Sequence, residues 1–133
     1  MIRKLLSFLL FTIMTAAASW AAGPNLVVSD KTHNFGTIRE ADGPVTCEFV
    51  MRNDGDKPLI IMSAKAQCGC TTPKIPKQPI RPGESATLTV TYDPAGRPGE
   101  FDKAIRVRTN QKQKNVILKI KGTVLPKSTP KKK

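Results

Sequence analysis

The chain has 133 residues, the usual size of a single domain, so a two-domain architecture is close to excluded. Its hydrophobic fraction is 39%, its aromatic fraction is 5%, and no collagen-type glycine or proline period is present, which excludes fibrous classes. The formal net charge is +12, but all ten Asp and Glu lie at or before Asp102, whereas residues 103–133 hold eleven Lys and Arg. This pattern indicates a near-neutral body with a basic final portion, not a uniformly basic nucleic-acid binder.

Residues 1–21 have the pattern of a secretory signal peptide. Arg3 and Lys4 begin it, an uncharged stretch rich in Leu, Phe, Ile and Ala follows, and small residues surround Ala21. Cleavage is expected after Ala21, with Ala18 as the second option. Because the apolar run is shorter than the about 20 residues that span a bilayer, we expect an exported protein with no membrane-integral part. The periplasm is its expected location, and the extracellular space is the alternative.

From residue 22 onward the pattern predicts strands. Short apolar or alternating runs are bounded by Gly, Pro, Asn or Asp, and no sustained helical stripe appears. In one such run Val45, Cys47, Phe49 and Met51 share a face that we expect to be core. The expected strands are 26–29 continuing after a break into 33–38, then 45–52, 59–66, 85–92, 101–109 and 115–124.

Six or seven short strands at about 10-residue spacing predict an all-β protein, an immunoglobulin-like β-sandwich of about seven strands over residues 22–125. Prolines 73, 76, 79 and 82 recur at every third position, a period that matches polyproline II. We expect them to form a stiff edge segment, with a ligand for a groove-type partner as the alternative. The tail 126–133 has nothing apolar to bury beyond its prolines and is expected to be disordered.

Cys68-Gly69-Cys70 is the most specific local feature. In an extended strand the two sulfurs would lie roughly 6–7 Å apart, but Gly69 tolerates positive φ and can fold the segment so that a two-cysteine ring closes. Three uses stay open: a structural disulfide, a redox-active thiol pair, and a soft-metal site for copper or zinc in which His33, and also Cys47, would join Cys68 and Cys70. Three cysteines cannot all pair within one chain. We expect Cys47 to be the free, buried one, with a Cys47 bridge as the weaker alternative.

The basic final portion is a second candidate surface. Without opposing acids, its lysines are expected to give weak, salt-sensitive attachment to anionic surfaces, unless they form only a solvated face and tail. They are Lys112, Lys114, Lys119, Lys121, Lys127, Lys131, Lys132 and Lys133.

Active-site patterns are lacking in the sequence. It has no Gly-rich phosphate loop, no G-x-S-x-G and no H-E-x-x-H, and the single His33 has no neighbour in sequence that would orient it as a base. We therefore expect no enzyme, no catalytic residues, and no cofactor other than the copper or zinc alternative.

Several motifs in fixed order resemble domain-of-unknown-function family 1573 over about residues 25–124. They are His33-Asn-Phe-Gly-Thr-Ile38, Asn53-Asp-Gly-Asp-Lys-Pro-Leu59, Cys68-Gly-Cys-Thr71, Ile80-Arg-Pro-Gly-Glu84, Tyr92-Asp93, Gly99-Glu-Phe101 and Thr109-Asn110. The resemblance implies an exported Ig-like domain of Gram-negative bacteria, related in architecture to the major sperm protein and Hydin-like group, and it supplies no reaction. Cys68, Gly69, Cys70 and Thr71 match the family's pattern, and Cys47 is not part of it.

Three functional hypotheses follow. The leading one is a periplasmic Ig-like binding module that contacts a protein partner of the cell envelope through sandwich edges and loops. The second is a thiol-redox or soft-metal protein centred on Cys68 and Cys70. The third is a protein that binds polyanions or membrane surfaces through its basic C-terminal part, without specific nucleic-acid recognition.

Overall fold

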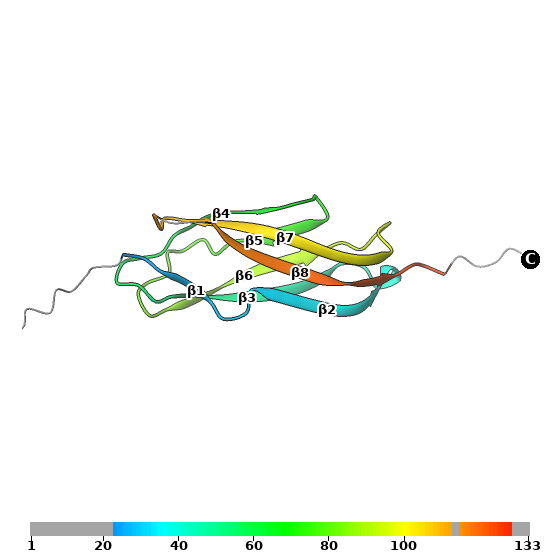
Figure 1. Cartoon of the computed structure of the whole chain (residues 1–133), viewed down its shortest axis with the longest axis horizontal. Coiled ribbons are helices and arrows are strands. Elements are labelled where there is room, and N and C mark those ends of the chain that lie inside the picture. The colour runs from blue at the N-terminus through cyan, green and yellow to red at the C-terminus, as the bar shows by residue number, and fades with distance from the viewer. Residues whose placement is uncertain (1–22, 113–114, 129–133) are drawn as a thin grey trace, which may run out of the picture.

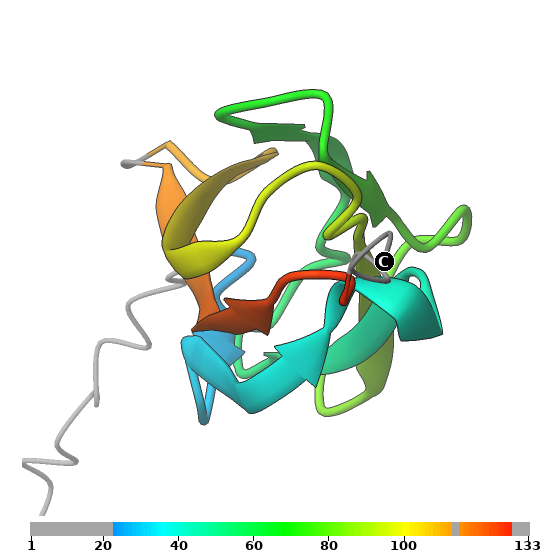
Figure 2. The same cartoon turned by 90° about the vertical axis from the view of Figure 1, so that its right-hand side faces the viewer.

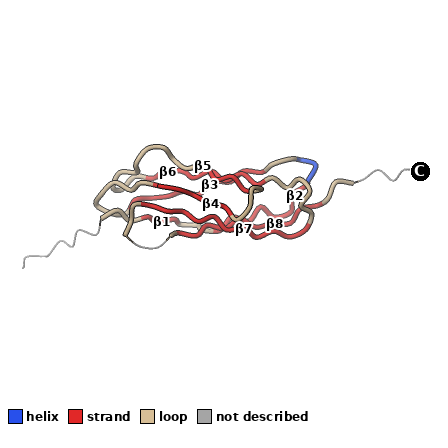
Figure 3. Tube along the Cα trace, turned by 90° about the horizontal axis from the view of Figure 1, so that it is seen from above, coloured by secondary structure: helices blue, strands red, loops and turns tan. Residues whose placement is uncertain are grey.

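A computed structural model describes residues 23–112 and 115–128, and most of this part of the chain is strand. The strands are β1 (Leu26–Val28), β2 (Thr32–Arg39), β3 (Val45–Asn53), β4 (Ile61–Ala66), β5 (Thr71–Lys74), β6 (Ser85–Tyr92), β7 (Gly99–Thr109) and β8 (Val116–Leu125). A 3₁₀ turn, η2 (Glu40–Asp42), joins β2 to β3 at one end of the molecule (Figure 3). The expected signal peptide lies outside the described residues.

Two four-stranded sheets pack face to face, with orders β1-β3-β6-β5 and β2-β8-β7-β4 (Figures 1 and 2). Strands β2 and β8 run parallel, and the other neighbouring pairs are antiparallel. The first sheet has the A-B-E-D order of the immunoglobulin constant type, and β8, β7 and β4 correspond to its G, F and C strands. Strand β2 departs from that pattern, because it adds a parallel edge strand beside β8. The expected all-β sandwich is confirmed, with eight strands in the described residues where about seven were expected.

The extra strand is β5, which lies where the sequence analysis placed a proline-rich edge segment. Its four residues pair with β6 alone, opposite Tyr92 to Thr89, and include Pro73. Proline is tolerated there because an edge strand has one side that needs no amide donor. Strand β4 begins at Ile61, two residues later than expected, because Leu59 instead exchanges two backbone hydrogen bonds with Ile80 at 2.9 and 2.8 Å.

The core lies between the sheets and follows the alternation of the strands. In β3 every second residue from Cys47 to Asn53 is buried, and β6 and β8 bury Leu88, Val90, Leu118 and Ile120 in the same way. Each fully buried aliphatic side chain contributes roughly 1.5–3 kcal/mol relative to an exposed one.

Aromatic rings fill one end of this core. Tyr92 stacks on Phe101 with ring centroids 4.0 Å apart, and Phe35 lies 6.3 Å from Phe101. His33 and Phe35 form a T-shaped pair with ring centroids 4.5 Å apart. His33 therefore has a packing role beside the core, in a geometry that aromatic pairs favour.

The described chain ends in a contact with the β2–β3 connection. The Lys127 amide donates to the Glu40 carboxylate at 3.1 Å, and the Gly96 amide donates to the same carboxylate at 2.9 Å. Lys127 of the expected tail is thus bonded to the domain through its amide, and residues 129–133 lie outside the described part. Within the described residues, no helix is long and apolar enough to cross a membrane.

Candidate functional site

A disulfide joins Cys68 and Cys70 in the turn between β4 and β5, with their Cα atoms 5.3 Å apart. Strands β4 and β5 belong to different sheets, so the bridged turn is the point at which the chain crosses the sandwich edge. Cys47 is the free thiol, and it is buried in the core as expected.

Backbone hydrogen bonds hold the bridged turn independently of the bridge. The Thr71 amide donates to the Cys68 carbonyl at 3.3 Å, and the Asp93 amide donates to the Cys70 carbonyl at 2.8 Å. Just before the turn, the Gln67 amide donates to the Ala104 carbonyl at 3.2 Å. The turn closes without a positive φ at Gly69.

The two sulfur-bearing residues differ in exposure. Cys70 is 4% exposed, Cys68 is half-buried, and Gly69 is exposed with open space where a Cβ would stand. The Thr71 hydroxyl lies 3.6 Å from the Cys70 sulfur and 3.9 Å from the Cys68 sulfur. A bridged sulfur carries no hydrogen, so the hydroxyl is the donor in either contact, and the Cys70 sulfur is the nearer acceptor for its single hydrogen.

A metal site formed by Cys68, Cys70 and His33 is not assembled. His33 lies on β2, and β2 and β4 are the opposite edges of one sheet, with β8 and β7 between them. Cys47 is also a poor ligand, because burial raises the pKa of its thiol to about 11. Among residues 23–112 and 115–128, no group of three His, Cys, Asp or Glu is placed to hold an ion.

The outward face of the β2-β8-β7-β4 sheet carries a second candidate site. Arg106 on β7 lies between Lys65 on β4 and Ile117 on β8, with Arg108 and Lys119 on neighbouring rows of the same face. Lys65, Arg106, Arg108 and Lys119, all exposed, are called the cationic patch below. Two apolar side chains accompany the patch: Ile117 is 41% exposed, and Met62, at the β4 bulge, is 55% exposed.

Only part of this patch could be found from the lysine pattern. Lys119 and Lys121 were expected and share the face, Lys112 follows β7, and Lys127 lies beyond β8. Lys114, Lys131, Lys132 and Lys133 lie outside the described residues. Arg106 and Arg108 were missed, although their alternation with buried Ile105 and Val107 marks them as outward-facing.

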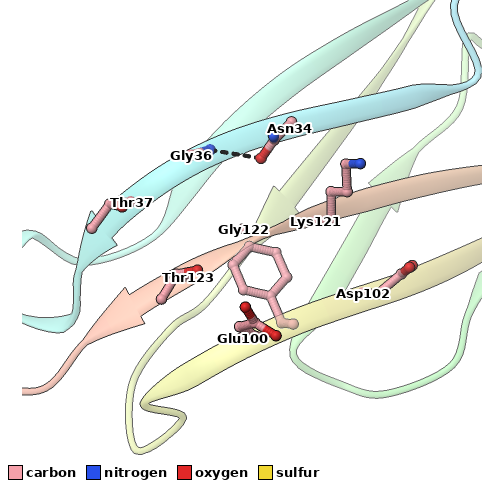
Figure 4. A pocket seen from close by; sticks show the side chains of 9 residues that line it. Asn34, Gly36, Thr37, Glu100, Asp102, Lys121, Gly122 and Thr123 are labelled. Atoms are coloured by element: carbon pink, nitrogen blue, oxygen red, sulfur yellow. Dashed lines mark hydrogen bonds between the residues drawn. The ribbon is translucent and has the colours of Figure 1, made fainter.

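At its other end the same face has a polar hollow of about 550 Å³ (Figure 4). Glu100 and Asp102 lie on its β7 side, Lys121 and Thr123 on β8, and Asn34 on β2. The hollow forms where β2 bulges between Asn34 and Thr37, with Gly36 at φ 67° and its amide bonded to the Asn34 side-chain oxygen at 2.9 Å. Lys119 reaches back to Asp102 at 3.7 Å.

The charge of this sheet face is therefore graded along the strands. Its outward strand residues include six bases and two acids, and both acids lie beside the hollow, away from Arg106 and Arg108. The bases are Arg39, Lys65, Arg106, Arg108, Lys119 and Lys121, and the acids are Glu100 and Asp102. The outward face of the other sheet has only Arg52, Lys74 and Glu48, among threonines such as Thr87.

Comparison with protein-family models identifies the family of this chain. It matches the family model described as a protein of unknown function (DUF1573) over residues 26–124. The chain belongs to the DUF1573 family. No curated protein matches its sequence.

Solved structures share the fold at low sequence identity. A protein of unknown function from Porphyromonas gingivalis W83 is 21% identical, with a TM-score of 0.67 over 83% of this chain and 51% of that one. The Vibrio cholerae VesB protease is 17% identical, with a TM-score of 0.55 over 75% and 31%. The E. coli chaperone DraB is 17% identical, with a TM-score of 0.53 over 79% and 57%. The DUF1573 chain thus spans about half the length of the first and third of these proteins and a third of the second.

Proposed function

We propose that this DUF1573 protein is a binding module of the bacterial envelope, which docks an acidic protein surface on the outward face of its β2-β8-β7-β4 sheet. The observation that carries the proposal is the concentration of Lys65, Arg106, Arg108 and Lys119 on one sheet face. The opposite face has no comparable cluster in its strands.

The grading of charge favours a protein partner over a membrane. A membrane surface is uniformly anionic, so Glu100 and Asp102 on the same face would be repelled by it. A folded partner can instead place acids opposite the cationic patch and bases or donors opposite the hollow.

The side chains of the patch also fit a protein interface. Arg and Met are enriched in such interfaces, and this face offers Arg106, Arg108 and Met62 together with Ile117. Burial of Met62 and Ile117 would supply affinity, and the charges would supply orientation and a faster association rate.

Export is part of the proposal and rests on the signal-peptide pattern of residues 1–21. A module released into the periplasm would meet other envelope proteins there. N-terminal sequencing of the protein from its native compartment tests this step: a start at Ala22 is expected. Recovery of Met1 on protein in the membrane fraction would contradict it.

Acidic and lipid probes test the choice of partner. Isotope-labelled protein is titrated with poly-L-glutamate, and separately with vesicles containing phosphatidylglycerol, at low and high salt. We expect salt-sensitive amide shifts from the peptide around Arg106, Arg108 and Ile117. Shifts centred on Val50 and Thr87 of the other sheet would contradict the assigned face, and binding to vesicles alone would favour the membrane instead.

A further inference from the structure

We infer that the Cys68–Cys70 bridge is a thiol–disulfide exchange site whose substrate is a pair of thiols on another polypeptide. This activity is separate from the docking proposed above and rests on different residues. It is carried by the smallness of the bridged loop, by the unequal exposure of its two cysteines, and by the Thr71 hydroxyl beside both sulfurs.

The bridge contributes little to the stability of the fold. It encloses Gly69 alone, and the stabilisation that a disulfide gives by restricting the unfolded chain is smallest for the shortest loops. The native turn is already fixed by the amides of Thr71 and Asp93, which donate to the carbonyls of Cys68 and Cys70. These backbone hydrogen bonds therefore remain in place when the disulfide is reduced.

Exposure assigns different roles to the two sulfurs. Cys68 is half-buried next to the open side of Gly69, whereas Cys70 is 4% exposed. An incoming thiolate can reach Cys68, and Cys70 is then the leaving group. The Thr71 hydroxyl, 3.6 Å from the Cys70 sulfur, is placed to donate to the thiolate that forms.

The exchange balances in two steps. A substrate thiolate attacks the Cys68 sulfur, the Cys68–Cys70 bond breaks, and the Cys70 thiolate takes a proton from solvent. The second substrate thiolate then attacks the substrate sulfur of the mixed disulfide and releases the Cys68 thiolate, which is protonated. The substrate loses two electrons to form a disulfide, and the cysteine pair gains them. A small-molecule disulfide such as oxidised glutathione restores the bridge by the reverse exchange.

The test follows thiols in the folded protein. A reduced synthetic peptide with two cysteines is mixed with the protein at neutral pH, and samples are alkylated and mapped by mass spectrometry. We expect the peptide to become oxidised, and alkylation in denaturant to label Cys68 and Cys70 only after the peptide has been added, whereas Cys47 is labelled with or without it. A bridge that stays intact in the folded protein and exchanges only in denaturant would overturn the proposal.

Thr71 variants test the chemistry itself. Thr71→Val keeps the shape and removes the donor, so its exchange should be about tenfold slower, whereas Thr71→Ser should exchange at nearly the wild-type rate. Cys47→Ala is the control and should exchange normally. Equal rates in all three variants would contradict the role of Thr71. Unchanged exchange in Arg106→Glu/Arg108→Glu would show that this site is independent of docking.

Discussion

Asn53 is the fully buried polar side chain at the end of β3, and its amide organises the turn that follows. Its nitrogen donates to the carbonyls of Lys57 and Ile80 at 2.7 and 2.8 Å. Its oxygen accepts from the amides of Asn25 and Gly55 at 3.3 and 2.9 Å. One side chain thus bonds four backbone groups at the sandwich end, and of these the Ile80 carbonyl also accepts from the Leu59 amide.

Replacing Asn53 by Ala should therefore be strongly destabilising. We expect a loss of about 2–4 kcal/mol in the free energy of unfolding, because one buried and three part-buried hydrogen bonds are lost together and a cavity is left at a fully buried position. Urea denaturation measures it. Asn34→Ala is the matched control, since exposed Asn34 makes one bond, to the Gly36 amide, and its loss should cost less than about 1 kcal/mol. Equal losses would contradict the assigned network.

The Cys47 thiol should be unreactive toward alkylating reagents in the folded protein. Burial raises the pKa of its thiol to about 11, so almost no thiolate is present at neutral pH. Iodoacetamide should leave Cys47 unmodified in native buffer and label it in denaturant. Cys47→Ala should cost about 1 kcal/mol as a small cavity. Rapid native labelling would show that the core opens around this residue.

At the scale of elements, the β2 bulge and β8 approach each other at two glycines. A Cβ at Gly122 would stand 2.8 Å from the Gly36 carbonyl oxygen and 2.9 Å from the Phe101 ring. The contact to backbone cannot be relieved by a side-chain rotation. Gly69, in contrast, faces open space.

Gly122 and Gly69 form a matched pair for substitution, because only Gly122 has backbone close to the position of a Cβ. Gly122→Ala should lower the free energy of unfolding by about 1–3 kcal/mol through overpacking, whereas Gly69→Ala should change it by no more than about 0.5 kcal/mol. The urea midpoints of the two variants, compared with that of the wild-type protein, measure these losses. A larger loss for Gly69→Ala would mean that the bridged turn needs glycine for a reason other than space.

Acid should release the contact between Glu40 and the residues it holds. The pKa of the Glu40 carboxyl is lowered from its ordinary value of 4.5, chiefly by the Gly96 amide and then by the Lys127 amide. The stabilisation is therefore complete above pH 4.5 and is lost as pH falls through the lower folded pKa. Amide shifts of Gly96 and Lys127 followed by NMR should titrate with a midpoint below 4.5. A midpoint above it would contradict the contact.

Strands with regular alternation could be predicted from sequence, and those without it could not. Residues 45–52 and 85–92 match β3 and β6 within a residue, because one buried face imposes a period of two. Strand β5 was missed because four residues containing Pro73 show no period and carry a signal against strand. Its pairing depends on β6, which only the folded chain supplies.

Of the two candidate sites, one could be predicted from sequence and the other could not. The Cys68-Gly69-Cys70 pair is local, so its spacing was sufficient to single it out. The cationic patch joins Lys65 to Arg106 across the β4–β7 register, which has a bulge between Ile61 and Ser63. No local pattern encodes that register, so the charges of two distant segments could not be placed on one face from sequence.

At the scale of the whole molecule, the two sheets differ in what they present to a partner. The β1-β3-β6-β5 sheet shows threonines and few charges, while the other shows the cationic patch and the hollow. The described chain begins and ends at opposite ends of the long axis, so both outward faces remain clear of these ends (Figure 1). The cationic face, and not the threonine-rich one, is the proposed docking surface.

Site-specific photocrosslinking in the living cell tests this claim most directly. A photoreactive residue is placed at Ile117, on the cationic face, or at Val50 on the opposite sheet, where the native side chains are 41% and 53% exposed. We expect a discrete protein adduct from Ile117, reduced at least about tenfold by Arg106→Glu with Arg108→Glu, and none from Val50. An adduct of equal yield from Val50, or one from Ile117 that is insensitive to the charge reversals, would contradict the account.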